Sequence, residues 1–157
     1  MRDNYILFSV ASTTYGLASQ DVAHVEMVED VTRVPNAPPH VDGVVFSRGA
    51  VIPAANLRAR FGFERVPYDT RTRLIVVQQN GRSVGLIVDA AREFVTIPAG
   101  VIQPPAEGLT GTSGRYLRGV ATIGERMILI LDISELLNGD ELATAGGFSR
   151  PRSSQEK

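Results

Sequence analysis

The chain carries one pattern of residues twice, and this repeat limits the possible folds more than any other feature of the sequence. Residues 41–44 (VDGV) recur as residues 117–120 (LRGV), an offset of 76. The same offset places residues 56–57 (NL) on residues 132–133 (DI). Between these anchors, turn residues separate two stretches rich in β-branched side chains, and a short helical pattern follows. Two strands, a turn and a helix therefore recur in one order.

The front parts of the two copies also match. Residues 15–17 (YGL) recur as residues 84–86 (VGL), at an offset of 69. The seven additional residues of the second copy fall in a loop rich in Pro, Gly and Thr, residues 98–115. Each copy has about five short strands, too few residues for a wide sandwich, and closure into a barrel hides the sheet edges. The sequence predicts a mainly β protein of two SH3-like five-stranded barrels with short helices.

The alternative is a chance similarity between two β meanders with glycine turns, which would not need a fixed register. If the repeat is real, residues 1–141 form a single domain with two barrel subdomains that meet near residues 63–73. Hydrophobic content falls from Gly139 onward. We expect residues 142–157 to form a disordered tail without a fold of its own.

Two turn signals give the sharpest local predictions. Asn80-Gly81 is the strongest two-residue signal for a β-hairpin. Residues 47–49 (SRG) predict a second turn, between strands at residues 41–46 and 50–55. Residues 57–61 (LRARF) predict a short helix, because a glycine follows them directly.

The composition excludes several classes of protein. The 157 residues include no cysteine, so disulfides, thiol nucleophiles and cysteine-bound metal sites are excluded. The net charge is −1 with both signs spread along the chain, and no basic face with interleaved aromatic residues indicates nucleic-acid binding. No apolar run approaches the ~18 residues of a membrane span, and the N-terminus lacks a secretory signal pattern. We therefore expect a cytoplasmic protein without direct membrane insertion.

The sequence offers few candidates for catalysis or metal binding. Only His24 and His40 could act as bases at neutral pH, and neither has a metal-ligand spacing or lies beside a glycine-framed serine. Glu26, Glu29 and Asp30 form an acidic cluster at a strand end, where a solvated face is the simpler interpretation than a metal site. No glycine-rich stretch has the spacing of a phosphate-binding loop. We predict a protein that is not an enzyme and needs no metal or cofactor.

A series of short motifs is spread over most of the chain. They are residues 15–17 (YGL), 31–38 (VTRVPNAP), 43–44 (GV), 48–49 (RG), 52–53 (IP), 56–57 (NL), 84–89 (VGLIVD), 116–120 (YLRGV) and 126–133 (RMILILDI). Together these motifs resemble the CheW family of chemotaxis coupling proteins. The resemblance runs from about Tyr5 to Glu141 and leaves only the tail unexplained. It implies two SH3-like barrels and a non-enzymatic scaffold.

The resemblance implies an adaptor that joins the cytoplasmic tips of chemoreceptors (methyl-accepting chemotaxis proteins) to the regulatory P5 domain of the histidine kinase CheA in membrane-associated arrays. Receptor tips dock in the groove between the barrels in this family. Arg48 is the foremost contact candidate, and the alternative is a turn arginine paired with a nearby carboxylate. Gly43 is expected to act structurally, because a side chain there would break the strand or crowd the groove. The positions that match receptor-contacting or receptor-sensitive sites are Val22, His24, Val25, Gly43, Arg48 and Phe94.

The sequence departs from the family pattern close to these positions. Phe46 and Ser47 replace the usual Asn-Leu before the Arg-Gly turn, Asn56 replaces the usual Asp, and His24 stands where an acidic residue is common. An exposed Phe46 would add apolar surface, whereas Asn56 removes a charge. These departures favour two alternatives: a diverged paralogue that serves surface motility or gene regulation, or one that binds only one of the two partners.

Overall fold

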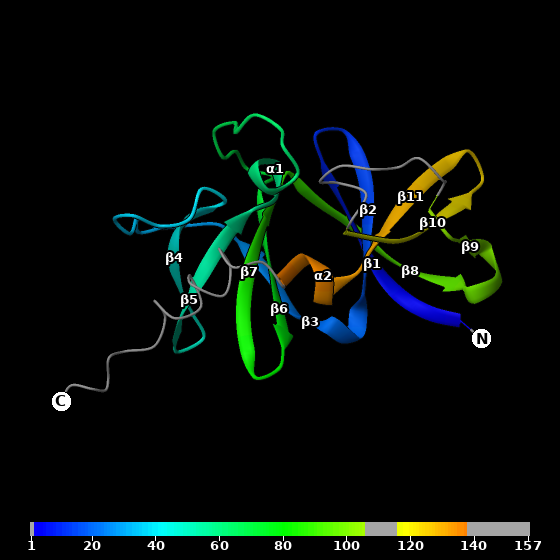
Figure 1. Ribbon diagram of the computed structural model, residues 1–157, viewed down its shortest axis with the longest axis horizontal. Coiled ribbons are helices and arrows are strands. Elements are labelled where there is room, and N and C mark those ends of the chain that lie inside the picture. The colour runs from blue at the N-terminus through cyan, green and yellow to red at the C-terminus, as the bar shows by residue number, and fades with distance from the viewer. Residues whose placement is uncertain (1, 106–115, 138–157) are drawn as a thin grey trace.

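A computed structural model describes residues 2–105 and 116–137, and its strands form two curled sheets (Figure 1). The strand order is β8-β1-β2-β11-β10-β9 in the first sheet and β3-β6-β7-β5-β4 in the second. The strands are β1 (Arg2–Val10), β2 (Thr13–Ala18), β3 (Val22–Met27), β4 (Val41–Ser47), β5 (Ala50–Asn56), β6 (Arg73–Gln79), β7 (Arg82–Val88), β8 (Ala90–Pro98), β9 (Ile102–Gln103), β10 (Leu117–Ile123) and β11 (Arg126–Leu131). The helical elements are η1 (Ser19–Asp21), α1 (Leu57–Arg60), η2 (Ala99–Val101) and α2 (Ile133–Leu137).

The predicted mainly β architecture with two β subdomains is confirmed. The second sheet has the five strands that the sequence predicts, and the first has six. The additional strand is β9, which is only two residues long and pairs with β10. Both predicted turns are present, since the hairpin β6–β7 turns at Asn80-Gly81 and β4–β5 turns at Arg48-Gly49.

Each sheet takes strands from both copies of the repeat. The order β8-β1-β2-β11-β10 in the first sheet matches β3-β6-β7-β5-β4 in the second, copy for copy. The registers match too: Ala54 pairs with Gly85 where β5 runs parallel to β7, and Ile130 pairs with Gly16 where β11 runs parallel to β2. The repeat is therefore a structural one, in which the front hairpins of the two copies are exchanged.

The exchange changes the boundary between the subdomains. We predicted that they meet near residues 63–73, but this segment joins α1 to β6 while β5 and β6 belong to the same sheet. The chain crosses from one sheet to the other at η1 and again at Asp89, between β7 and β8. The front hairpin of each copy packs with strands of the other copy. The repeated segment of the sequence therefore does not coincide with either sheet. The predicted tail, residues 142–157, lies outside the described residues.

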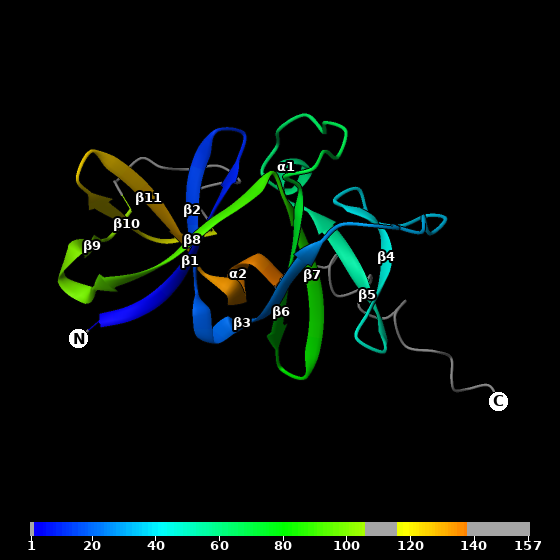
Figure 2. The same ribbon diagram turned by 180° about the vertical axis from the view of Figure 1, so that it is seen from behind.

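The described residues form three apolar cores, and one of them holds the two sheets together. One core lies inside each sheet. The third, which we call the common core, contains side chains from both sheets and from α1 and α2. In β1, Ile6 and Phe8 belong to the common core, whereas Tyr5 and Leu7 belong to the interior of the first sheet. A strand buried on both faces reads as a continuous apolar run. Figures 1 and 2 accordingly place α2 between the two sheets from both sides.

Both sheets close at equivalent places, and each closure stands beside a glycine. Thr32, which follows β3, bridges to Val44 of β4, and β9, which follows β8, pairs with β10. A Cβ atom on Gly43 would lie 2.1 Å from the carbonyl oxygen of Thr32, and one on Gly119 would lie 2.7 Å from that of Gln103. Each closure therefore requires a residue without a side chain, which explains the repeated Gly-Val pair.

Asp89 fixes the second crossing between the sheets. Its Oδ2 atom accepts hydrogen bonds from Nη2 of Arg58, at 2.8 Å, and from the backbone N–H of Ala11, at 2.8 Å. Its own N–H donates to the carbonyl oxygen of Ser9 at 3.0 Å. One side chain thus joins the crossing to α1 and to the β1–β2 turn.

Candidate functional site

The six predicted site residues lie in both sheets and form two groups. The first group lies in the second sheet, at the seam between β3 and β4 and at the turn that follows β4. The second group lies beside the common core, on β3 and on β8 of the first sheet. The first group is His24, Gly43 and Arg48, and the second is Val22, Val25 and Phe94.

His24 belongs to a hydrogen-bonded cluster that also contains Glu26 and Ser47. Nε2 of His24 lies 2.5 Å from Oε2 of Glu26 and 3.2 Å from Oγ of Ser47, and Oγ of Ser47 donates to Oε2 of Glu26 at 2.6 Å. On β3, His24 pairs with Val76 of β6 and Glu26 pairs with Leu74 of β6. The side chains of both β6 residues belong to the interior core of the second sheet. Because cross-strand partners share a face, the cluster lies on the interior side of β3.

The electrostatics of this cluster favour an ionised Glu26. Burial raises the pKa of Glu26, but hydrogen bonds from Ser47 and His24 and the electrostatic effect of His24 and Arg48 lower it, and the net pKa is below the ordinary 4.5. An ionised carboxylate only accepts hydrogen bonds, so Nε2 of His24 must carry the hydrogen. The cluster is therefore an anion held by two donors, and the cationic Arg48 lies nearby.

Arg48 occupies an exposed and strained turn. Its φ is +49° and that of Gly49 is +87°, as in a type I′ hairpin turn, where Asn-Gly is the favoured pair. A left-handed conformation costs a non-glycine residue about 1–2 kcal/mol. Among the described residues, Arg48 makes no hydrogen bond and no ion pair. The alternative, a turn arginine paired with a nearby carboxylate, therefore has no contact in the structure to support it.

Apolar side chains stand on the same hairpin as Arg48. Phe46, the residue before Ser47, is 73% exposed and pairs across the ladder with Val51, which is also exposed. Cross-strand partners lie side by side on one face. The hairpin thus presents an arginine, a residue that is enriched in binding hot spots, beside an exposed apolar pair.

Val25 and Phe94 hold equivalent places in the two sheets. Val25 pairs with Ile75 and Phe94 pairs with Ile6, and both partners belong to the common core. Val25 packs against that core together with Val22, whereas Phe94 is 68% exposed. These residues flank the region between the sheets, where we predicted a docking groove. The interior of that region is filled by the common core.

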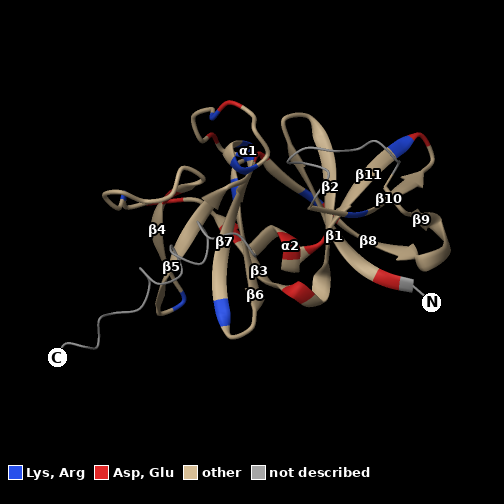
Figure 3. Cartoon of the chain, viewed as in Figure 1, with Lys and Arg blue, Asp and Glu red and all other residues tan. Residues whose placement is uncertain are grey.

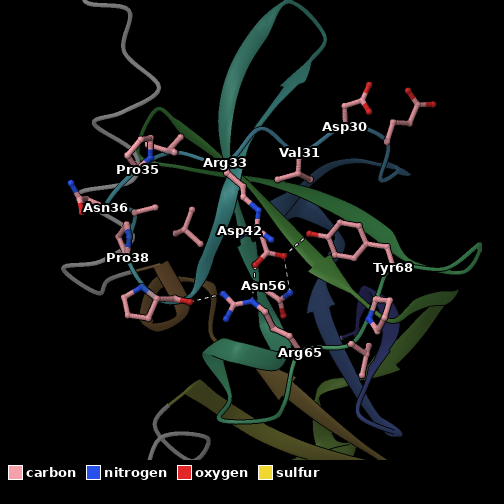
Figure 4. Close-up of a pocket in the computed structure, with 17 residues that line it drawn as sticks. Asp30, Val31, Arg33, Pro35, Asn36, Pro38, Asp42, Asn56, Arg65 and Tyr68 are labelled. Atoms are coloured by element: carbon pink, nitrogen blue, oxygen red, sulfur yellow. Dashed lines mark hydrogen bonds and ion pairs between the residues drawn. The ribbon is translucent and has the colours of Figure 1, made fainter.

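A pocket lies elsewhere in the second sheet and contains none of the six predicted residues. It has a volume of about 950 Å³ and is formed by the segment after β3 and the segment after α1 (Figure 4). Asp42 accepts hydrogen bonds there from Nε of Arg65, at 2.8 Å, from Nδ2 of Asn56, at 2.9 Å, and from the hydroxyl of Tyr68. Burial and Asp42 raise the pKa of Tyr68 far above its ordinary value. These groups stabilise one another through their hydrogen bonds.

Within the described part of the chain, charged residues of both signs are mixed. Figure 3 shows arginines interspersed with Asp and Glu over both sheets. Within residues 2–105 and 116–137, no three His, Asp or Glu side chains are grouped so that they could hold a metal ion. No helix in the same residues has the length and apolar character to cross a membrane.

Comparisons with known proteins identify the family. The family model described as the CheW-like domain matches residues 4–141. The chain belongs to the CheW family. It is 32% identical to the chemotaxis protein CheW of Klebsiella aerogenes over 93% of this chain and 88% of that protein. The crystal structure of the scaffolding protein TtCheW from Thermoanaerobacter tengcongensis superposes with a TM-score of 0.81 at 31% identity, covering 90% of this chain and 96% of that one.

A further relative is similar in sequence over most of its length. Protein FrzA of Myxococcus xanthus is 28% identical over 85% of this chain and 84% of that protein. Members of the CheW family are scaffold proteins, so the chain is not an enzyme and its role is in chemotaxis signalling.

Two departures from the CheW-family pattern have structural explanations. Asn56 is 4% exposed; its Nδ2 donates to Asp42, and its Oδ1 accepts from the N–H of Ala59 as the N-cap of α1. Ser47 is 6% exposed and belongs to the cluster with Glu26. Both side chains are buried, so any effect of these two changes on a partner must be indirect. Phe46 is exposed, as we expected.

The sequence interpretation missed the role of Glu26. We assigned it to a solvated face together with Glu29 and Asp30, but its carboxylate is bonded to two side chains. Strand alternation offered a signal, because residues 24 and 26 share one face of β3. A polar pair on the core-facing side of a strand requires partners, and Ser47 supplies one from a distant segment.

Proposed function

We propose that this CheW-family protein couples chemoreceptors to the histidine kinase CheA in membrane-associated signalling arrays. One observation carries the proposal: two closed sheets share a common core, so one molecule offers two separate outer faces. A scaffold needs separate faces, because two partners cannot occupy the same surface at once. Family membership supports the same conclusion.

Arg48 is the residue that we propose for the receptor contact. It stands exposed beside Phe46 and Val51, and it keeps a left-handed conformation that asparagine would adopt at a lower cost. Strained residues persist where the surrounding structure holds them and cluster at functional sites. Val22, His24, Val25, Gly43 and Phe94 remain proposed as neighbours or supports of this contact.

Replacing Arg48 by asparagine separates binding from folding. We expect Arg48→Asn to leave the melting temperature unchanged or raised, because Asn-Gly is the preferred type I′ pair. We expect its affinity for receptor-containing membranes to fall at least about tenfold, the loss for a typical arginine hot spot. Co-sedimentation with the membranes and thermal unfolding measure the two effects.

The matched control is Arg71→Asn, which removes the charge of another exposed arginine outside the proposed surface. We expect it to bind receptor membranes as the unchanged protein does. Full receptor affinity in Arg48→Asn would contradict the assignment of this residue.

A second candidate function follows from the relationship with FrzA and from the unusual residues near Arg48. The protein would then be a paralogue that serves another chemosensory pathway, such as surface motility or gene regulation, or that binds only one partner. Phe46 is the observation that favours this alternative, because its exposed ring changes the apolar character of the hairpin. Separate binding measurements with receptor membranes and with CheA distinguish a two-partner scaffold from a one-partner protein.

A further inference from the structure

We propose that His24, Glu26 and Ser47 are positioning residues for Arg48. In this proposal their hydrogen bonds hold the β4–β5 turn against β3 and so fix the direction in which the arginine is presented. The inference rests on the proposed function of Arg48 and adds the part of the structure that makes this contact possible.

The backbone alone gives the turn little support from β3. β3 pairs with β6, and β4 pairs with β5, so the two strands share no ladder. Among the described residues, the backbone link at this seam is the bridge between Thr32 and Val44. Val44, the β4 residue of that bridge, lies three residues before Ser47, so the bridge does not reach the turn itself. The side-chain cluster supplies the connection nearer to Arg48.

Ser47 is the point at which the cluster meets the turn. It is the last residue of β4, it pairs with Ala50 across the turn, and it directly precedes Arg48. Its hydroxyl donates to Glu26 at 2.6 Å and lies 3.2 Å from Nε2 of His24, so both partners come from β3. A hydrogen-bonded anchor adjacent to a left-handed residue restricts the rotation of the whole turn about β4.

The charges around the anchor agree with this role. Glu26 is the negative group of the cluster, and the positive charge of Arg48 acts on it without a direct ion pair in the described structure. A direct pair would turn the guanidinium back toward the barrel. The hydrogen bonds of Ser47 and His24 instead satisfy the carboxylate, which leaves the five N–H donors of Arg48 available to a partner.

A double-mutant cycle tests the proposal on the full-length protein. Ser47→Ala removes the anchor and should weaken binding to receptor-containing membranes about fivefold, while binding to CheA stays the same. In the Arg48→Ala background the same change should have no further effect, because the effects of residues that act through one another are not additive.

Glu26→Ala is the second variant, and we expect the same pattern from it. Ser83→Ala is the control, because it removes a serine hydroxyl that accepts a hydrogen bond from Gln78 on another hairpin, away from Arg48.

The outcomes separate the two proposals. If Arg48→Ala binds receptor membranes normally, both the receptor contact and the positioning role are overturned. If Arg48→Ala binds weakly but Ser47→Ala and Glu26→Ala bind normally, only the positioning role is overturned. An equal loss from Ser47→Ala in both backgrounds, together with a loss of CheA binding, would indicate a general structural effect and would also overturn it.

Discussion

Replacement of Gly43 by alanine should lower the free energy of unfolding by about 3 kcal/mol or more. The new Cβ atom would lie 2.1 Å from the carbonyl oxygen of Thr32, and the φ of Gly43 is +152°. The atom in the way belongs to the backbone, so it cannot move aside as a flexible side chain would. The two hydrogen bonds between Thr32 and Val44, at 2.9 and 2.8 Å, must separate, and the second sheet opens at its seam. Chemical denaturation measures the change.

Two other glycines serve as matched controls for this variant. Gly49 has a φ of +87° but no atom within 4 Å of an added Cβ, so Gly49→Ala should cost only about 1 kcal/mol. Gly100 has neither the clash nor a positive φ, and Gly100→Ala should be close to neutral. If Gly43→Ala is no less stable than Gly49→Ala, steric closure at this seam is not what Gly43 provides.

Removal of the Asp89 carboxylate should also destabilise the fold, by about 2 kcal/mol in Asp89→Ala. The N–H of Ala11 would lose its acceptor and Arg58 would lose its ion pair. The hydrogen bond to Asp89 raises the pKa of Arg58. A guanidinium stays protonated at neutral pH without this bond as well, so the variant leaves a charged group without its partner. Because Asp89 lies at the crossing between the sheets, we expect the loss to appear in the cooperative unfolding of both sheets, monitored by denaturant titration and by hydrogen exchange.

The control for Asp89 is a more exposed ion pair of the same kind. Glu93 and Arg126 are 3.2 Å apart with side chains 45% and 43% exposed, compared with 28% and 21% for Asp89 and Arg58. Exposed pairs contribute about 0–1 kcal/mol. Equal stability losses in Glu93→Ala and Asp89→Ala would show that Asp89 is only another surface charge.

The repeat predicted most of the strands but not their partners. Residue spacing showed that residues 41–61 and 117–137 follow one plan, and the structure confirms this down to the shared N-cap positions, Asn56 and Asp132. The pattern does not state which copy a hairpin packs with, because β1 and β6 both contain a run of four apolar residues and each run would fit either sheet. Exchange of the hairpins is decided by long-range packing in the common core, which a single sequence does not reveal.

The candidate site was predictable in part for a similar reason. Arg48-Gly49 is a local turn signal, and the structure places it at an exposed hairpin end. The cluster that supports it joins residues more than twenty positions apart, His24 with Ser47, so no local pattern contains it. The pocket around Asp42 is of the same kind, because Arg65 and Tyr68 reach it from the segment after α1.

Co-sedimentation of CheA with receptor-containing membranes tests the central claim most directly. The coupling account predicts that CheA sediments with the membranes when this protein is added, that little CheA does so without it, and that Arg48→Asn lowers the amount while leaving soluble binding to CheA intact. The contrary result is clear: if the protein binds receptor membranes and CheA separately but never brings CheA to the membranes, it is not a coupling scaffold.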